Sequence, residues 1–379
     1  MVAYAAAEPS PAASRNSPGE SDVTPLSLAT TPQALPGSRS IGWIEVGRIL
    51  AIVAVIAIHV ASPLITRAGH PESWWLGNLI QSTSRWSVPV FVMISGALIL
   101  RSRRTAELGQ FYRRRLTRLG IPMVFWITAF LIFGHVMSNT PPTLHDALVS
   151  VAAGRPYYHL WFLFVIGGLA VIAPLLAWAV QTPGRPLLAF VAVAYVLAII
   201  ANILTTLGIG QPNAVTRFGP YLAEFLAGFA LLTVASTPAR ARTAVGVLIV
   251  GVVLTAIGTW LLVQPDVLGP GRGLYLYEYH SITTVPVSLA VYLLLIWSGP
   301  AIERHLTGRR RRLLMTVGAA TFGVYLIHPM TLVGLGRLGV SATMTFAPLA
   351  VALTVGSAFA ISLLAVLAMQ RVPWVRALV

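Results

Sequence analysis

Ten apolar stretches, most of them about twenty residues long, constrain this chain more than any other feature of its sequence. They span residues 43–65, 75–100, 119–138, 159–180, 187–207, 218–235, 244–263, 281–298, 314–334 and 346–369. Such stretches can cross a membrane as helices, in which every backbone polar group is paired within the segment. Hydrophobic residues make up 56% of the chain and charged residues only 10%. The sequence therefore predicts an all-α integral membrane protein, a bundle of about ten transmembrane helices.

The basic residues indicate how these helices are oriented. All 26 are arginine, and most arginines outside the apolar stretches follow the second, fourth, sixth, eighth and tenth stretch. By the positive-inside rule, this arginine-rich side is cytoplasmic. We therefore predict that both termini lie in the cytoplasm. We interpret the net charge of +15 as topology and contact with membrane lipids, and not as nucleic-acid binding.

Composition also bounds the domain organisation and the chemistry. Residues 1–40 are rich in Ala, Pro, Ser and Thr and lack a sustained apolar pattern, which predicts a disordered cytoplasmic tail. The remainder, 41–379, is predicted to be one membrane domain. The chain has no cysteine, and its eight histidines show no pairing at metal-binding spacing, so we expect no metal site and no permanently bound cofactor.

Three ionisable residues lie in the first apolar stretch. Arg48 and His59 are eleven residues apart, which in an α-helix places both side chains within about 20° of the same face. Glu45 precedes Arg48 by three residues and is expected to pair with its guanidinium. Ionisable groups inside a span are costly and are functional candidates by default. The alternative is an interfacial arginine with a histidine bonded to a neighbouring helix.

The second and third stretches add further polar groups. Arg85 lies about ten residues into its stretch, so its guanidinium is expected to face a partner or a water-filled cavity instead of lipid. Ser95 precedes Gly96, a pair that is typical either of close helix packing or of ligand contact. Arg115 and Arg118, at the entrance to the third stretch, are expected to share a helix face and to suit phosphate binding.

Five polar or aromatic residues fall in the outer halves of later stretches: His159, Trp161, Glu224, Tyr325 and His328. By rise per residue, His59, Glu224 and His328 lie at similar depth. Glu224 is expected to pair with Arg85 or to orient a histidine. Each residue alone is equally consistent with an interhelical bond, but several ionisable groups at one depth favour a shared site.

Five blocks occur in a characteristic order: Glu45-x-x-Arg48-x10-His59, Val88–Gly96, Arg115-x-x-Arg118-x-x-x-Pro122, His159–Leu163 and Thr321–His328. Together they resemble the acyltransferase family 3 membrane O-acyltransferases, and most of all the bacterial surface-polysaccharide O-acetyltransferases. The resemblance covers about residues 41–370. It implies transfer of an acyl group, usually acetyl, from cytoplasmic acyl-CoA to a hydroxyl of a carbohydrate or lipid-linked glycan. It further implies a bacterial inner or plasma membrane, which the chain crosses several times, with the acceptor on the outer side.

The resemblance leads to residue-level hypotheses. We assign catalysis to His59, Arg48, Glu45 and His328, coenzyme binding to Arg48, Arg115, Arg118 and Ser95, and acceptor binding to Arg85, His159, Trp161, Glu224 and Tyr325. Acetyl-CoA, or another acyl-CoA, is then a co-substrate. His59 acts either as general base for the acceptor hydroxyl or as a covalent carrier of the acyl group.

A proton-coupled transporter or flippase for a glycolipid is the alternative function. Such a protein would also use intramembrane Arg, Glu and His together with aromatic outer loops. The arginines at the cytoplasmic entrance favour the acyltransferase, because a flippase has no reason to bind acyl-CoA.

Overall fold

The computed structural model describes residues 42–66, 71–102, 105, 107–138, 141–181, 186–344 and 346–379. The predicted tail, 1–40, lies outside the described residues. The same holds for four arginines that contribute to the orientation argument: Arg67, Arg103, Arg104 and Arg185.

The described residues form helices and connecting loops, with no strand among them. The helices are α1 (Gly42–Thr66), α2 (Pro71–Ser84), α3 (Ser87–Leu100), α4 (Leu108–Arg115), α5 (Ile121–Met137), α6 (Leu144–Ala152), α7 (Trp161–Gln181), α8 (Leu187–Thr206), α9 (Leu222–Ala230), α10 (Pro238–Leu262), α11 (Gly269–Arg272), α12 (Thr284–His305), α13 (Gly308–Arg337) and α14 (Ala347–Met369). Short turns of tighter or wider helix join some of them, including η2 (Leu116–Gly120) and η5 (Gly273–Tyr277).

Within the described part of the chain, nine helical segments are long and apolar enough to cross a membrane. The protein is therefore an all-α, multi-pass membrane protein, as the sequence predicts. The tenth expected span, 218–235, is instead a shorter apolar helix over Gly219–Thr233. At about 1.5 Å per residue it covers roughly 23 Å, which is less than the hydrocarbon core of about 30 Å. This segment is packed inside the bundle, where α9 lies against α3 and α8.

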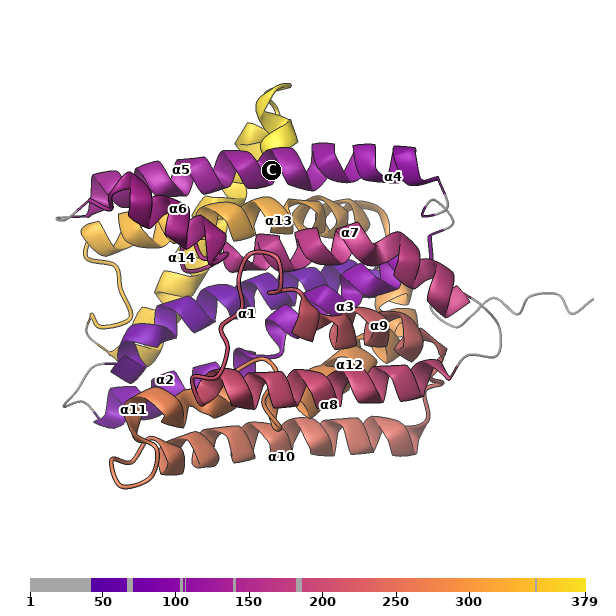
Figure 1. Ribbon diagram of the computed structural model, residues 1–379, viewed down its shortest axis with the longest axis horizontal. Helices are drawn as coiled ribbons and strands as arrows, with labels where there is room; N and C mark the ends of the chain where they lie inside the picture. Colours follow the sequence, from indigo (N-terminus) through magenta and orange to yellow (C-terminus); the bar gives the residue numbers. More distant parts are fainter. Residues whose placement is uncertain are drawn as a thin grey trace, which may run out of the picture. The chain divides into compact units, whose positions relative to one another are not determined.

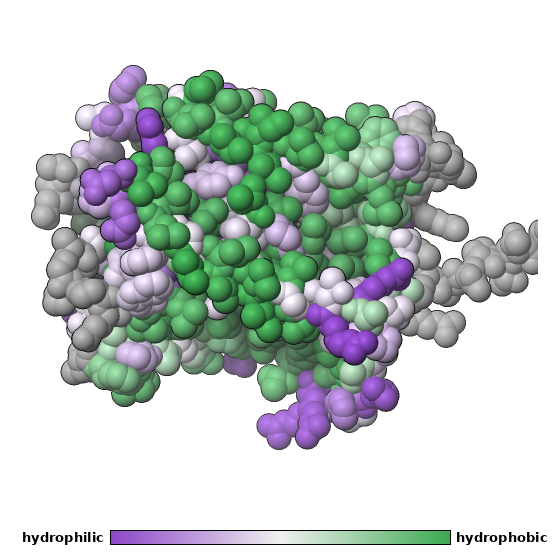
Figure 2. Space-filling model, turned by 90° about the horizontal axis from the view of Figure 1, so that it is seen from below, coloured by the Kyte–Doolittle hydropathy of each residue, from purple (hydrophilic) through white to green (hydrophobic). Residues whose placement is uncertain are grey.

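Apolar side chains cover the outside of the bundle where lipid would surround it. Figure 2 shows one such face, with hydrophobic residues over the middle of the helices and hydrophilic residues towards their ends. Large exposed hydrophobic residues such as Val124, Leu197 and Ile249 lie on α5, α8 and α10. A soluble protein would not expose such an area, so the surface agrees with the span assignment.

Helix α1 runs through the centre of the bundle (Figure 1). It contacts α2, α3, α12, α13 and α14, and it buries residues around most of its circumference. A helix that is apolar all round is stable only where other helices cover it, or where lipid does. We call the end of the bundle where α1 begins the proximal end (right in Figure 1) and the opposite end the distal end.

Helices α3 and α9 cross at two glycines. A Cβ at Gly96 would overlap the backbone carbonyl of Phe225, and a Cβ at Gly228 would overlap that of Met93. The Tyr292 hydroxyl of α12 donates to the Gly228 carbonyl at 2.7 Å and fixes the same crossing. Because glycine lets two backbones approach this closely, Gly96 serves helix packing, which is one of the two roles expected for the Ser95-Gly96 pair.

We predict that Gly96→Ala lowers the stability of the folded protein by about 1–3 kcal/mol or more, because the added methyl group has no space against the α9 backbone. The melting temperature in detergent micelles measures this effect. Gly246→Ala is the matched control, since this exposed glycine of α10 has open space around it and alanine favours helix. Equal melting temperatures for the two variants would contradict the packing account.

Candidate active site

A cavity of about 390 Å³ lies beside α1 and gathers most of the residues that the sequence singles out. Its walls come from α1, α3, α7, α13, the segment around η2 and the loops before α7 and α12. The predicted site residues among its lining are Arg48, His59, Ser95, Arg115, Arg118, His159, Trp161 and Tyr325. Arg48, Val55 and His59 line it together, as the helical spacing predicts for one face of α1.

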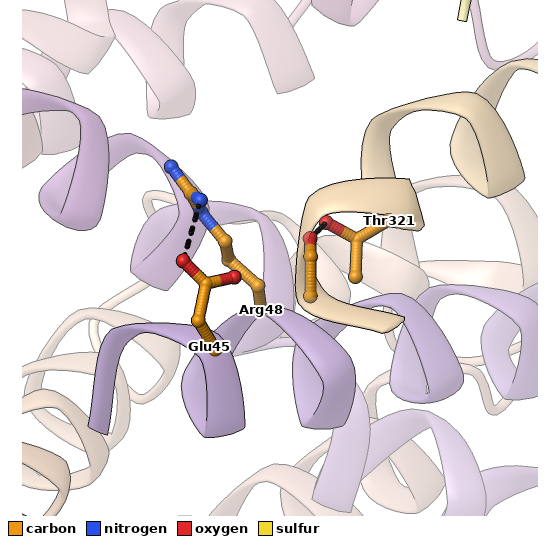
Figure 3. Close-up of polar contacts among 4 residues, drawn as sticks. Glu45, Arg48 and Thr321 are labelled. Carbon is orange, nitrogen blue, oxygen red and sulfur yellow. Dashed lines mark hydrogen bonds and ion pairs between the residues drawn. The ribbon is translucent and has the colours of Figure 1, made fainter. Parts of the chain in front are cut away.

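At the proximal end of this cavity, Arg48 forms a pair with Glu45 (Figure 3). An Nη atom of Arg48 donates to Glu45 Oε1 at 3.1 Å, which confirms the expected ion pair. Glu45 is buried, whereas the Arg48 side chain is 30% exposed and reaches the cavity. The other Glu45 oxygen lies against Gly318 of α13, where no Cβ would fit. Glu45 therefore positions the guanidinium, and it is not among the residues that line the cavity.

Arg115 and Arg118 line the same cavity. The α-helix widens after Arg115 at η2, which contains Arg118, and the Ile121 amide donates to the Leu116 carbonyl five residues earlier. Pro122 has no amide hydrogen for the bond that a regular α-helix needs here, which favours this wider turn. The expected i, i+3 geometry is therefore altered, but both arginines still reach one cavity. Arg115 also lies over the Phe111 ring, 5.2 Å from its centroid.

Ser95 lines the cavity between the arginines and His59. Its hydroxyl donates to the Phe91 carbonyl one turn earlier at 2.9 Å. The hydroxyl hydrogen is thus already used within α3, and the oxygen is available to the cavity only as an acceptor.

Three histidines from three segments meet at the inner end of the cavity. The rings of His59 and His328 stack with centroids 5.4 Å apart, and His159 lies edge-on to His328 at 5.4 Å. Tyr325 links two of these segments, because its hydroxyl donates to the His159 carbonyl at 2.7 Å. Among the described residues no cluster of His, Asp and Glu has the arrangement of a metal site.

His328 is fully buried behind His59. Its Nδ1 lies 2.8 Å from the Tyr325 carbonyl oxygen. Since a carbonyl can only accept, we assign the hydrogen to Nδ1, which leaves Nε2 as an acceptor in the neutral ring. His328 Nε2 is buried without a hydrogen-bond partner. His328 thus belongs to the layer of side chains that supports His59.

A second cavity, of about 820 Å³, lies towards the distal end. Arg85, Arg155, Arg217 and Glu278 contribute its charged lining. His59, Trp161 and Tyr279 line both this cavity and the first one. His59 therefore lies where a proximal, arginine-bearing cavity meets a distal one.

Arg85 lies at a break between α2 and α3, and its guanidinium faces the distal cavity instead of lipid. It lies over two aromatic rings, 5.2 Å from the centroid of Tyr277 and 5.7 Å from that of Tyr279. The Tyr277 hydroxyl donates to Asn78 Oδ1 at 2.6 Å, which holds that ring beneath the guanidinium. The aromatic faces attract the cation, and the guanidinium also donates a hydrogen bond to the Tyr279 hydroxyl.

Glu224 does not pair with Arg85. Its Oε1 lies 3.2 Å from His280 Nε2, and both side chains are buried. Of the two partners expected from the sequence, the structure therefore selects a histidine. Glu224 lies outside the linings of the two cavities described above, while His280 lines a third, more distal cavity of about 750 Å³. Trp161 reaches all three cavities, with its ring against those of Tyr221 and Tyr279.

Several lining residues were not among the predicted site residues: Arg155, Tyr158, Arg217, Glu278 and Tyr279. All of them lie in the distal connections, far apart in sequence from α1. The aromatic, histidine-containing stretches 154–159 and 271–280 were the available signal for four of them. Spacing alone does not reveal which loop residues fold over a helix bundle.

Comparison with known proteins adds one finding. The model of an acyltransferase domain family matches residues 41–365, which is most of the chain. No curated protein and no solved structure matches the chain.

Burial of the His159 imidazole is expected to make the stability of the folded protein depend on pH. Burial, together with the nearby His328 and His59, holds the pKa of His159 well below its usual value near 6.5. A group whose pKa is lowered on folding in this way binds its proton more readily when unfolded. The folded state is therefore fully favoured above about pH 6.5 and loses up to about 1.4 kcal/mol per pH unit below it.

We expect His159→Phe, which keeps the aromatic packing, to reduce the loss of melting temperature between pH 7.5 and pH 5. His145→Phe, at an exposed position on α6, is the control and should keep the full loss. If His159→Phe shows the same pH dependence as the unsubstituted protein, this assignment of a neutral, buried His159 is wrong.

Proposed function

The chain belongs to acyltransferase family 3, and from this premise we propose that it transfers an acyl group from acyl-CoA to a hydroxyl of a carbohydrate or lipid-linked glycan. We propose that acetyl-CoA is the donor and enters from the cytoplasm at the proximal end. The acceptor, a bacterial surface polysaccharide or its lipid-linked precursor, enters at the distal end.

The observation that carries this proposal is the position of His59 between two cavities. A transfer between two co-substrates that approach from opposite membrane faces needs one reactive group that both can reach. Three arginines line the proximal cavity, whereas the distal cavity combines arginines with tyrosine and tryptophan rings. These linings suit a phosphate-bearing nucleotide on one side and a hydroxyl-rich ring on the other.

On the donor side, Arg48, Arg115 and Arg118 bind the phosphates of CoA. Guanidinium groups suit this task because they donate paired hydrogen bonds to phosphate oxygens. Arg48 and His59 are separated along α1 by about 16 Å, a distance that the extended pantetheine arm spans. The walls between them are mainly apolar, with Val55, Phe91 and Phe162 among them. Ser95 offers an acceptor oxygen to the amide hydrogens of that arm.

In the chemical step, His59 removes the proton of the acceptor hydroxyl as the oxygen attacks the thioester carbonyl. The tetrahedral intermediate then collapses, the carbon–sulfur bond breaks, and the proton passes from His59 to the leaving thiolate. A positioned base of this kind contributes about 10²–10⁴ in rate. Arg85 stabilises the developing negative charge or orients the acceptor, and Trp161 offers the sugar a stacking face.

His328, His159 and Tyr325 keep His59 in place. The Tyr325 hydroxyl holds the segment before α7, and the Tyr325 carbonyl fixes the tautomer of His328. Glu45 holds Arg48 in the same way. Of the Glu224–His280 pair, only His280 lines a distal cavity, the third one, and could contact the acceptor.

The test measures release of free CoA from acetyl-CoA by the protein in liposomes, with acceptor glycans inside. His59→Ala is expected to lower kcat at least a hundredfold. Arg48→Ala is expected mainly to raise KM for acetyl-CoA, because it removes a phosphate contact. His145→Ala and Arg337→Ala are matched controls at exposed positions outside the cavities, and both should retain full activity.

Two results would contradict the proposal. One is a His59→Ala variant that folds and turns over acetyl-CoA like the unsubstituted protein. The other is the absence of acetyl-CoA binding together with movement of a glycolipid across the liposome membrane, which would indicate a transporter. Isolation of an acylated protein after acetyl-CoA alone would instead establish covalent transfer through His59.

A further inference from the structure

The distal cavities carry an excess of positive charge that acyl transfer to a neutral sugar does not require. Four arginines line the second and third cavities: Arg85, Arg155, Arg217 and Arg272. Glu278 is the one acidic side chain in these two linings, as far as the chain is described. Arg85 and Arg217 are half-buried, and charges in such positions are normally paired, so this imbalance points to a negative ligand.

Arg155 and Arg217 lie at the centre of this positively charged region. Both line the second and the third cavity, so they lie where these two spaces adjoin. Burial and the neighbouring Arg155 charge lower the pKa of Arg217, as expected for two cations held near each other. No ion pair joins either guanidinium to a described Asp or Glu. An anion between the two would relieve their mutual repulsion.

The structure holds Arg217 in this position. Its Nη2 donates to the carbonyls of Ala153 at 2.6 Å and Pro212 at 3.0 Å, which links the loops before α7 and α9. Arg155 is exposed to the cavities and makes no comparable structural bond among the contacts of the described residues. Arg155 is therefore free to bind a ligand, while Arg217 contributes a fixed charge.

Arg85 completes the set on the side nearest His59. It lies on the rings of Tyr277 and Tyr279 without a carboxylate partner in the described structure. The other buried acid nearby, Glu224, is already occupied by His280. Three guanidinium groups thus surround the distal cavity that opens onto His59.

We propose that the acceptor is anionic, with a carboxylate or phosphate held by Arg155, Arg217 and Arg85 while a nearby hydroxyl reaches His59. The part of this inference that concerns the acceptor hydroxyl rests on the proposed acyltransferase function. Binding of an anion by the three arginines does not depend on that function. A sugar acid and a phosphate-bearing lipid precursor share this chemistry, because guanidinium pairs bind either group through bidentate hydrogen bonds.

Equilibrium binding tests the receptor without any turnover. The probe is trigalacturonate, and its fully methyl-esterified form is the control of equal size without charge. We expect the acid to bind at least tenfold more tightly than the ester at low ionic strength, with the difference shrinking as salt is added. Decyl phosphate and decyl maltoside, compared in the same way, distinguish a lipid-borne phosphate from a sugar carboxylate.

Arg155→Gln is the informative variant, because Arg217 also holds two loop carbonyls. The Arg155→Gln substitution should weaken binding of trigalacturonate five- to tenfold and leave binding of its methyl ester unchanged. Arg337→Gln removes the same charge at the distal end but outside the cavities, and it should bind like the unsubstituted protein. The proposal is overturned if acid and ester bind equally and decyl phosphate binds like decyl maltoside. It is also overturned if the two arginine variants behave alike.

Anion binding and acyl transfer can fail independently of each other. Turnover of acetyl-CoA with a neutral glycan, combined with equal binding of acid and ester, would keep the enzyme and remove the anion receptor. Tight, Arg155-dependent binding of the acid without any acetyl-CoA turnover would keep the receptor and remove the enzyme.

Discussion

The structure depends on a central helix that carries charge through an apolar bundle. Helix α1 is covered by five other helices, yet it holds the Glu45–Arg48 pair and His59. Exposing such groups to hydrocarbon would cost several kcal/mol, so they must face one another or a cavity. Both solutions are found, since Glu45 is buried against Arg48 and Gly318 while Arg48 and His59 face the proximal cavity. The position of the cavity follows from this requirement.

The surrounding helices keep that cavity open in two ways. Close contact at Gly96 and Gly228 brings α9 against α3 without filling the space in front of Ser95. Bulky rings then separate the proximal from the distal space, with Trp161 and Tyr279 beside His59 at the boundary. His59 thus lies at an aromatic boundary between the two cavities. In the reaction that we propose, such a boundary would limit water near the thioester and favour transfer over hydrolysis.

Local periodicity was sufficient to predict part of this arrangement. The common face of Arg48 and His59 and the ion pair at Glu45 follow from residue spacing alone, because both involve a single helix. The wide helical turn that contains Arg118, the partner of Glu224 and the shortened helix 219–233 depend on tertiary contacts or on backbone bonds that spacing does not encode. The distal residues Arg155, Arg217 and Tyr279 lie in connecting loops, whose course over the bundle has no periodic signal.

The central claim is that donor and acceptor meet at His59. The most direct measurement is an experimental structure of the protein in lipid nanodiscs with a non-hydrolysable thioether analogue of acetyl-CoA. Our account predicts phosphate density beside Arg48, Arg115 and Arg118 and the analogue's sulfur within about 4 Å of the His59 ring, a near-attack distance. Phosphates bound at the distal arginines, or a sulfur that remains outside the proximal cavity, would contradict it.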